Sequence, residues 1–415
     1  MSKPHRVAIT GIGMVSPFGG STADFFDHIA RGDSSIRLYR TDDQPRPLAV
    51  PAVYCAHFDP AGRLGKALAG TMDRFTQLGV AAAFEAWEHA GFSVTDKQSR
   101  PDFGVSWGTA LGGTQTFEHG YRDLWLHGRE RLSPLSVVFG MNNAASAQIG
   151  IQLGLGNSCL SYTVACASAA AAIGEAYERI RNGGATVMLT GGSDATLSYG
   201  VVRAWEAMRV MAGGDENTAP AACRPFHAER TGLVLGEGAA ALVLEEWDHA
   251  IARGVPILAE LAGYGASCDH SHLVRPEAAG QVRAMQQALD RAGLRVEDIG
   301  YINAHGTATR EGDPVEISAL RSLFGERAAQ LPVSASKSMH GHLMGASGAI
   351  EALVTVLALQ QDTIPPTANL DKLDPACEGV RHVTGNALRG TGLRAALSNS
   401  FAFGGSNAVL AFRAA

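Results

Sequence analysis

The sequence has little of what marks a secreted, disulfide-stapled or membrane-spanning protein. Its 415 residues include only six cysteines, none of them in a CxxC pair, which is too sparse for a disulfide scaffold. No run approaches the eighteen or so apolar residues that a membrane helix needs. The N-terminal apolar run is broken by Gly11, Gly13 and Pro17, unlike a signal peptide. We therefore expect a cytoplasmic chain with reduced thiols and no membrane contact.

Basic charge is also scarce. The chain carries 34 basic and 40 acidic side chains, a net charge of -6, and has no run of five or more basic residues. Because phosphate backbones are bound by basic stripes, this balance argues against a nucleic-acid partner. What the chain has is apolar residues, 46% of the total, enough to bury a large core.

Strand and helix signals alternate along the chain, which predicts α/β layers. We expect strands at 5–10, 103–107, 186–190, 239–244, 257–263, 299–303, 395–400 and 408–412, and helices at 22–30, 72–89, 167–181, 279–292, 314–324 and 346–359. Two of the strands, 187–192 and 397–405, end in a glycine pair. This weak echo favours two similar halves, and the division would fall near 247–256.

Cys166 lies in the first of three short segments that contain candidate catalytic residues. It stands just before an alanine-rich helical run that ends at Asn182-Gly183-Gly184. A thiol at a helix N-terminus is favoured as thiolate, so we expect its pKa to fall below about 8.5. A buried structural cysteine is the alternative, because free cysteine packs like a small apolar side chain.

His305 and His342 lie in the other two of these segments. His305 follows a predicted strand, and His342 lies five residues after Lys337. Glu351 lies on the helix that follows. A lysine near a carboxylate is usually a solvated pair, but pairing becomes mandatory if both are buried. One thiol and two imidazoles indicate nucleophilic catalysis.

Two further interpretations come from the residues alone. Cysteine plus two histidines could bind zinc, but no carboxylate or second cysteine has ligand-like spacing, so we expect no metal. The segment 401–407, FAFGGSN, is a glycine turn with unencumbered N–H groups. It could supply an oxyanion-hole donor, with a phenylalanine gating access to the thiol, or it could be a simple hairpin with core aromatics.

Taken together, these segments resemble the beta-ketoacyl-acyl carrier protein synthases of the synthase-II type. The resemblance runs nearly end to end: it includes 7–13, VAITGIG, the Met72-Asp73 pair, 231–239, TGLVLGEGA, the His305 and 337–342 segments, and the closing turn. It implies a thiolase-like, five-layered αβαβα fold of two similar halves, 1–255 with the cysteine and 256–415 with the histidines.

The resemblance also implies roles for individual residues. Cys166 looks like the nucleophile that accepts an acyl chain; malonyl carrier protein then loses carbon dioxide and condenses with it, giving a 3-oxoacyl product. His305 and His342 look like the neutral pair that stabilises the enolate, and Lys337 like the lysine that organises the site. The remaining implied roles are Glu351 as a supporting carboxylate, the N–H groups of Cys166 and Phe403 as the oxyanion hole, Thr307 and Thr309 on the phosphopantetheine arm, and Phe403, Phe401, Leu111 and Trp205 at the gate and acyl pocket.

No metal or diffusible cofactor is implied, since the substrates travel on the phosphopantetheine of an acyl carrier protein. The implied assembly is a homodimer, or a heterodimer with a chain-length-factor-like subunit. The basic segment that often docks the carrier in this family reads GKALAGT at 65–71, which leaves Arg131 and Arg209 as docking candidates. This loss of charge should slow association with a generic acidic partner.

Other departures from the family pattern favour a specialised enzyme. Trp205 replaces a smaller aromatic, Ala402 replaces a glycine, and Asn157-Ser158-Cys159 precedes the nucleophile strand. One alternative is therefore a dedicated synthase of a polyketide or polyene system working with a chain-length partner. A non-catalytic, tunnel-shaping subunit and a biosynthetic thiolase are further alternatives, which the intact cysteine and the paired histidines disfavour.

Overall fold

The computed structural model describes residues 4–42 and 46–415. Residues 1–3, part of the N-terminus in which we expect no signal peptide, lie outside that range. Among the helices of the described chain, none combines the length and the apolar character needed to cross a membrane.

The main sheet of the described chain has thirteen strands. It contains two five-stranded sections with the same topology, which form the centre of the molecule and are called the first and the second sheet below. The first has the order β5 (Cys159–Tyr162), β4 (Phe103–Gly108), β6 (Val187–Ala195), β7 (Leu235–Glu246) and β1 (Val7–Val15). The second has the order β10 (Pro332–Ser334), β9 (Tyr301–Asn303), β14 (Ala395–Ala402), β15 (Ser406–Arg413) and β8 (Ala259–Cys268). In each, the first three strands are parallel, the fourth is antiparallel to both of its neighbours, and the fifth therefore runs in the direction of the first three. The glycine pairs that end the two predicted strands at 187–192 and 397–405 therefore correspond to a structural repeat.

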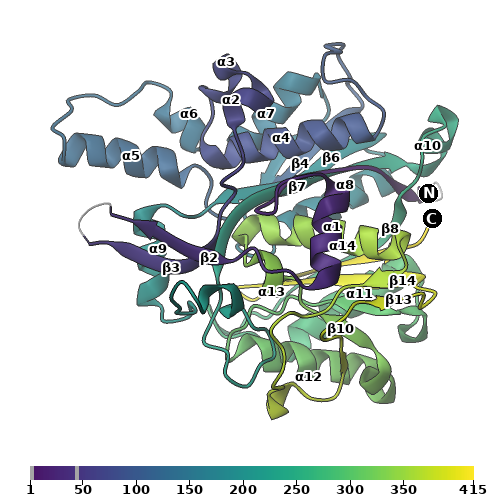
Figure 1. Cartoon of the computed structure of the whole chain (residues 1–415). Helices are drawn as coiled ribbons and strands as arrows, with labels where there is room; N and C mark the ends of the chain where they lie inside the picture. Colours follow the sequence, from purple (N-terminus) through teal and green to yellow (C-terminus); the bar gives the residue numbers. More distant parts are fainter. Residues whose placement is uncertain (1–3, 43–45) are drawn as a thin grey trace.

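Helices alternate with the two sheets to give five layers (Figure 1). Helices α4 (Arg74–His89) and α7 (Ala144–Leu153) cover the outside of the first sheet, and α11 (Ala278–Ala292) and α12 (Gly312–Phe324) cover the outside of the second. Helices α8 (Ser168–Arg181) and α14 (Ser347–Gln360) lie between the sheets and contact each other. The predicted αβαβα architecture is confirmed.

The composition of the two central helices explains their place. α14 is buried along its length except at Gln360, and α8 buries a run of four alanines. A helix that is apolar on all sides requires packing on all sides. The two helices approach closely because a side chain is missing at Gly348, where a Cβ would lie 2.7 Å from the backbone nitrogen of Ala170.

The expected elements are present, with small shifts at their ends. The helix expected at 72–89 begins at Arg74, because Asp73 is its N-cap and accepts the N–H of Phe75. The proposed division at 247–256 is occupied by α10 (Trp247–Arg253). β1 extends past its predicted end to Val15, because it pairs with β7 over the whole of its length.

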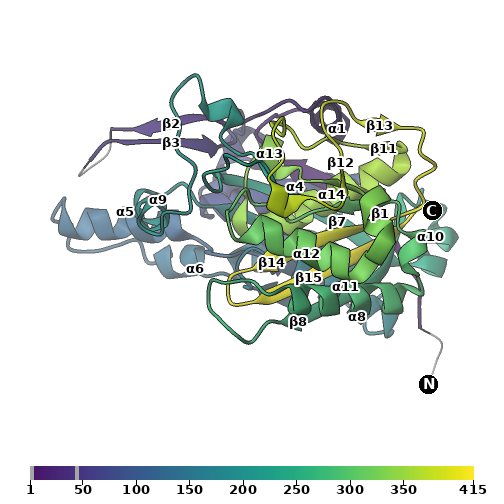
Figure 2. The same ribbon diagram turned by 90° about the horizontal axis from the view of Figure 1, so that it is seen from below.

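Several elements have no counterpart in the sequence prediction. They are the hairpin β2 (Arg37–Thr41) and β3 (Leu48–Val53), α2 (Pro60–Leu64), α3 (Lys66–Ala69), α5 (Thr114–Trp125), α6 (Ser136–Gly140), α7, β5, α9 (Tyr199–Ala207), α10, β10, α13 (Lys337–His340), and the short β11 (Thr363–Ile364), β12 (Arg381–His382) and β13 (Leu388–Arg389). The helix expected at 22–30, in contrast, is present as α1 (Thr22–Arg31). Most of the missed elements are short or lack a buried face, so hydrophobic periodicity gives little signal. Figure 2 shows α5 and the β2–β3 hairpin extending to the same side of the molecule.

Candidate active site

Cys166 lies in a tight turn immediately before α8. Ala165 adopts φ 46, a left-handed conformation that is uncommon for a residue with a side chain. Ser168 holds this turn, since its hydroxyl accepts the N–H of Val164 at 2.8 Å and donates to the carbonyl of Ala165 at 2.6 Å. The turn points the thiol toward a cavity, although Cys166 itself is only 5% exposed.

The expected low pKa of this thiol is wrong. Burial raises the pKa of Cys166 to about 11, and the charge of Asp194 adds to the effect. Lys337 and the backbone N–H groups of Phe403 and Cys166 act in the opposite direction. The helix end does not compensate for the loss of water around the sulfur, so the resting group is the thiol.

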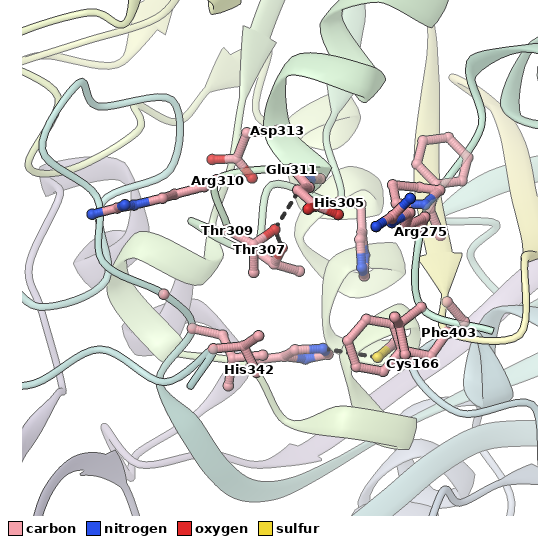
Figure 3. A pocket seen from close by; sticks show the side chains of 18 of the residues that line it. Cys166, Arg275, His305, Thr307, Thr309, Arg310, Glu311, Asp313, His342 and Phe403 are labelled. Carbon is pink, nitrogen blue, oxygen red and sulfur yellow. Dashed lines mark hydrogen bonds between the residues drawn. The ribbon is translucent and has the colours of Figure 1, made fainter. Parts of the chain in front are cut away.

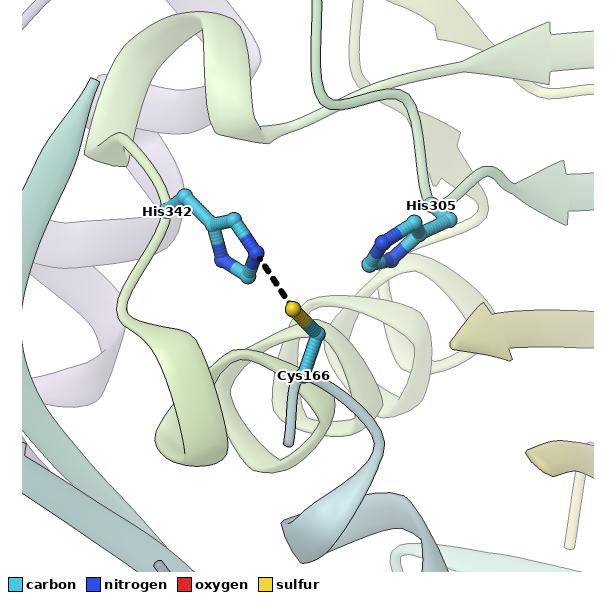
Figure 4. Close-up of side chains that lie close together, drawn as sticks. All are labelled: Cys166, His305 and His342. Carbon is cyan, nitrogen blue, oxygen red and sulfur yellow. Dashed lines mark hydrogen bonds between the residues drawn. The ribbon is translucent and has the colours of Figure 1, made fainter. Parts of the chain in front are cut away.

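His342 is held as a hydrogen-bond donor to that thiol. The backbone N–H of His342 donates to the carbonyl of Val234 at 2.7 Å, and this hydrogen bond fixes the backbone of the residue. Its Nδ1 accepts the N–H of Met344 at 3.2 Å and lies 2.8 Å from the hydroxyl of Ser347. Because Nδ1 is an acceptor, the neutral ring carries its proton on Nε2. That Nε2 lies 3.0 Å from the sulfur of Cys166 (Figure 4).

His305 is held in the same tautomer by different groups. It follows β9, and both its own N–H and that of Gly306 donate to the carboxylate of Glu316 at 2.9 Å. The ammonium of Lys337 lies 3.3 Å from its Nδ1 and can only donate there. The proton of the neutral ring is therefore on Nε2.

The two imidazoles remain uncharged near neutral pH. Burial, followed by the charge of Lys337, lowers the pKa of both His305 and His342 well below its usual value. The rings stand nearly perpendicular, at 88°, with centroids 5.7 Å apart. One nitrogen of each ring and the sulfur of Cys166 lie within 4.8 Å of one another. The site thus combines one thiol and two neutral N–H donors.

Lys337 and Glu351 form a fully buried ion pair behind the histidines. The ammonium of Lys337 contacts the Glu351 carboxylate and donates to the carbonyl of His305 at 2.6 Å. Both side chains are at most 1% exposed. Burial raises the pKa of Glu351, while the neighbouring ammonium lowers it. The sequence left open whether the Lys337–Glu351 pair is solvated or buried, and in the structure the pair is buried.

A cavity of about 550 Å³ leads to the thiol and is lined by both halves of the chain (Figure 3). Cys166, His305 and His342 line this cavity. Six further residues that the sequence analysis had selected also line it: Trp205, Arg209, Thr307, Thr309, Phe401 and Phe403. The two threonine hydroxyls are 3.0 Å apart. Phe403 lies in the turn between β14 and β15 and stacks on Trp205 with centroids 5.9 Å apart.

Two of the predicted residues, Leu111 and Arg131, do not line this cavity. Leu111, expected in the acyl pocket, is not part of the lining of this cavity; its N–H donates instead to Asp194 at 3.3 Å. Arg131 is exposed in the segment between α5 and α6, also outside the cavity lining. Sequence order could not distinguish these positions, because the loops that reach the cavity are selected by the packing of the two halves.

Four buried charged residues around the site were missed. Glu316 accepts the backbone N–H of His305 at 2.9 Å, and Asp194 accepts that of Gly345 at 2.6 Å. Asp313 lines the cavity and accepts the N–H of Phe226 at 2.8 Å. Arg230 donates to the carbonyl groups of Thr309 and Arg310 at 2.8 and 3.0 Å. A signal was present for two of them: Glu316 lies on the apolar side of α12, and Asp194 is the second-last residue of a fully buried strand. A charge in such a position is rarely there without a partner.

Comparison with known proteins agrees with this site. The family described as "Beta-ketoacyl synthase, N-terminal domain" matches residues 5–250, and "Beta-ketoacyl synthase, C-terminal domain" matches 258–371. The chain is 43% identical to Nodulation protein E of Rhizobium sp. (strain N33), over 99% of both chains. It is 38% identical to 3-oxoacyl-[acyl-carrier-protein] synthase 2 of Staphylococcus aureus (strain N315), over 100% of this chain and 99% of the relative.

Solved structures extend the likeness to three dimensions. A beta-ketoacyl synthase from Burkholderia phymatum STM815 superposes with a TM-score of 0.90 at 34% identity, and the ishigamide ketosynthase/chain length factor with 0.89 at 31%. A type II polyketide ketosynthase in complex with its acyl-carrier protein gives 0.89 at 28%. Each comparison covers 99% of this chain and all of the other. The chain therefore belongs to the beta-ketoacyl synthase family, thiolase-fold acyltransferases whose condensation reaction elongates acyl chains in fatty-acid or polyketide synthesis, and it has that condensing activity.

Proposed function

We propose that Cys166 carries the growing acyl chain and that His305 and His342 activate the malonyl unit that extends it. The observation that supports this most directly is the 3.0 Å contact between the Cys166 sulfur and the Nε2 of His342. It places an N–H donor, and no base, next to the nucleophile. The same donor can then serve an oxygen atom in the second half of the reaction.

In the first half-reaction, the sulfur of Cys166 attacks the carbonyl carbon of an acyl thioester. The carbonyl oxygen becomes an oxyanion, which the N–H groups of Cys166 and Phe403 would hold; one such donor is worth about 3–4 kcal/mol. Those two N–H groups already lower the pKa of the thiol, which supports their position beside the reacting atoms. The carbon–sulfur bond of the incoming thioester breaks, and the departing thiolate takes the proton that Cys166 loses.

In the second half-reaction, malonyl thioester loses carbon dioxide and its electron pair forms an enolate. The enolate oxygen would accept hydrogen bonds from the Nε2–H groups of His305 and His342. Its α-carbon attacks the acyl carbonyl on Cys166, the bond to sulfur breaks, and a 3-oxoacyl thioester leaves. The Cys166 thiolate formed in this step takes a proton from solvent and returns to the resting thiol. Neutral imidazoles suit this role because they stabilise charge without surrendering a proton.

Thr307 and Thr309 would bind the amides of a phosphopantetheine arm, and Arg209 at the cavity would meet the acidic carrier protein, with Arg131 a second, more distant candidate. The side chains of Thr307 and Thr309 lie at the cavity and their hydroxyls face each other. An acyl carrier protein is thus the proposed partner, as in the type II polyketide complex named above. We place this chemistry in the cytosol, where the six free cysteines stay reduced.

We propose no metal or diffusible cofactor at this site. Cys166, His305 and His342 are near enough to one another to surround an ion. Zinc, however, binds the lone pair of a neutral imidazole nitrogen. Here Met344 and Lys337 occupy both Nδ1 atoms, so the Nε2 atoms that face the thiol carry protons and have no lone pair to offer.

The assembly we propose is a homodimer formed through β5. This strand ends the order of the main sheet and, within residues 4–42 and 46–415, is bonded on one side only, to β4. Large apolar side chains are exposed on it and on the nearby α5–α7 region: Trp125, Leu126, Val137, Val138, Met141, Ile151 and Leu160. Open strand edges and exposed apolar patches of this kind mark protein interfaces. A chain-length-factor-like partner on the same surface is the alternative outcome.

A dedicated, specialised synthase is the second candidate for the pathway. It is favoured by the ring of Trp205, which stacks on Phe403, and by the 65–71 segment before α4, which carries a single basic residue, Lys66. Condensation assays with a housekeeping carrier protein and with a carrier encoded near this chain distinguish a housekeeping synthase from a specialised one. Efficient and exclusive use of the housekeeping carrier would remove the specialised one.

The assignment of roles is tested by single substitutions and mass spectrometry. Cys166→Ala should lose acyl loading completely. His305→Ala and His342→Ala should still load an acyl group but lose condensation by at least about a hundredfold, the usual effect of removing an oxyanion donor. Full condensation in the Cys166→Ala variant, or failed loading in both histidine variants with intact folding, would contradict the proposal.

A further inference from the structure

Asp194 is a buried carboxylate that the reaction described above does not use. It lies near the end of β6, is 0% exposed, and accepts four hydrogen bonds. Oδ1 accepts the hydroxyl of Thr109 at 2.8 Å and the N–H of Leu111 at 3.3 Å. Oδ2 accepts the N–H of Ala110 at 2.9 Å and that of Gly345 at 2.6 Å. Three of the four donors are backbone groups, so the carboxylate fixes chain positions.

These donors belong to two loops from different halves of the molecule. Thr109, Ala110 and Leu111 follow β4, whereas Gly345 lies three residues after His342. The loops touch directly, because a Cβ on Gly345 would lie 2.3 Å from the nitrogen of Ala110 and 2.6 Å from Oδ2 of Asp194. The close approach leaves Gly345 little freedom to move away from the carboxylate.

The loop that Asp194 holds also carries both groups that contact Nδ1 of His342, the N–H of Met344 at 3.2 Å and the hydroxyl of Ser347 at 2.8 Å. Met344, between His342 and Gly345, adopts φ 49, a conformation that a residue with a side chain keeps only where its surroundings impose it. In that conformation its N–H points at Nδ1 of His342, 3.2 Å away. The contacts therefore run without a gap from Asp194 through Gly345 and Met344 to His342, whose Nε2 faces Cys166.

We propose that Asp194 is a positioning residue for the condensation: by holding Gly345 it keeps Met344 in its left-handed conformation and His342 as an Nε2–H donor. An amide in its place could accept on one side only, and its NH₂ group would face backbone N–H donors. The proposal rests on the proposed role of His342 for its effect on rate, but its effect on the tautomer is independent of that role.

The test compares Asp194→Asn with the unchanged protein in two assays. Condensation should fall about 10–100-fold, the cost measured when a group that orients a metal-bound histidine is removed, while acyl loading of Cys166 should be unchanged. Nitrogen NMR of histidine-labelled protein, with the signals of His342 assigned from a His342→Ala sample, should show loss of the pure Nε2–H tautomer. Asp194→Glu keeps two acceptor oxygens, so it should recover part of the condensation rate and part of the NMR signal of the Nε2–H tautomer.

Glu245→Gln is the matched control. Glu245 is also a fully buried strand carboxylate with several hydrogen bonds, to Thr10, His249 and Arg253, but it has no link to His342. It should change neither condensation nor the histidine signals. An unchanged His342 tautomer together with full condensation in Asp194→Asn would overturn the proposal.

Two further results keep the test decisive. If Asp194→Asn does not fold, Thr109→Val removes one of the four hydrogen bonds while leaving the one to Gly345. It should speed hydrogen exchange at the amides of Met344 and Gly345, and unchanged exchange would count against the proposal. If His342→Ala itself condenses normally, the proposed function fails, while the NMR result still decides whether Asp194 sets the tautomer.

Discussion

Lys337 donates a 2.6 Å hydrogen bond to the backbone carbonyl of His305 and lies 3.3 Å from Nδ1 of the same residue. One ammonium group thus fixes both the backbone and the tautomer of a reacting residue. Its positive charge also contributes to keeping both His305 and His342 neutral and lowers the pKa of the Cys166 thiol. The only carboxylate bonded to this ammonium in the described chain is that of Glu351.

Removing Lys337 should therefore affect both stability and catalysis. Lys337→Met leaves Glu351 buried without its partner, which typically costs about 3–5 kcal/mol in the free energy of unfolding. Urea unfolding measures this loss. The double variant Lys337→Met/Glu351→Leu should recover most of the stability yet remain inactive, because it loses the ammonium that contacts Nδ1 of His305 and holds its tautomer. Recovery of condensation in the double variant would show that the pair is only structural.

The Cys166 thiol should react more slowly than an ordinary cysteine near neutral pH. Because burial raises its pKa to about 11, the thiol is protonated below that pH, and thiolate increases about tenfold for each pH unit on approach to it. Iodoacetamide labelling of the Cys166 peptide, followed by mass spectrometry between pH 7 and 10, should show a rising rate with no plateau. The Cys166→Ala variant gives the background. A plateau near pH 7–8 would mean that the resting group is a thiolate.

His305 and His342 should not titrate near the usual histidine pKa. Burial and Lys337 lower the pKa of His305 and His342, so protonation, which would remove the neutral form, requires a pH well below 6.5. Nitrogen NMR of histidine-labelled protein should show both rings neutral between pH 6 and 8. This measurement reports on the rings alone, whereas the condensation rate also depends on Asp194 and Glu351, whose pKa burial raises to about 6 and about 7. Protonation of either ring centred near pH 6.5 would contradict the prediction.

Trp205 should restrict which acyl groups enter. Its ring stacks on Phe403 at an interplanar angle of 19° and lines the cavity. Trp205→Ala removes that ring and should raise kcat/KM for longer or branched acyl groups relative to short ones by about tenfold, as expected for a change in an apolar pocket. Competition between two acyl carriers measures the ratio. Trp247→Phe, outside the cavity, is the control, and equal ratios in all three proteins would contradict the prediction.

The exposed edge of β5 should be needed for self-association. Leu160 lies on that strand and is 45% exposed, so Leu160→Lys would place a charge in the proposed interface, where edge charges prevent pairing. Sedimentation should show a dimer for the unchanged protein and a monomer for this variant. Ile251→Lys, on α10 and 59% exposed, should remain dimeric. A monomeric unchanged protein would instead favour assembly with a different subunit.

The sequence by itself determined much of this protein, because local signals suffice where periodicity and spacing are strong. The alternation of strands and helices, the buried helix after Cys166 and the His305 and His342 segments could all be read from residue order. The family resemblance added the layered fold and the condensing chemistry. The roles assigned to these residues remain predictions.

Only the tertiary structure decided the electrostatics of the site. A helix N-terminus next to Cys166 predicts a low pKa, but burial between the two halves outweighs it and raises the pKa to about 11. Likewise, the tautomers of His305 and His342 depend on Lys337 and Met344, and the hold on the His342 loop depends on Asp194, 148 residues before that histidine in the chain. Solvation and hydrogen-bond direction are set by neighbours in space, which no local pattern of residues specifies.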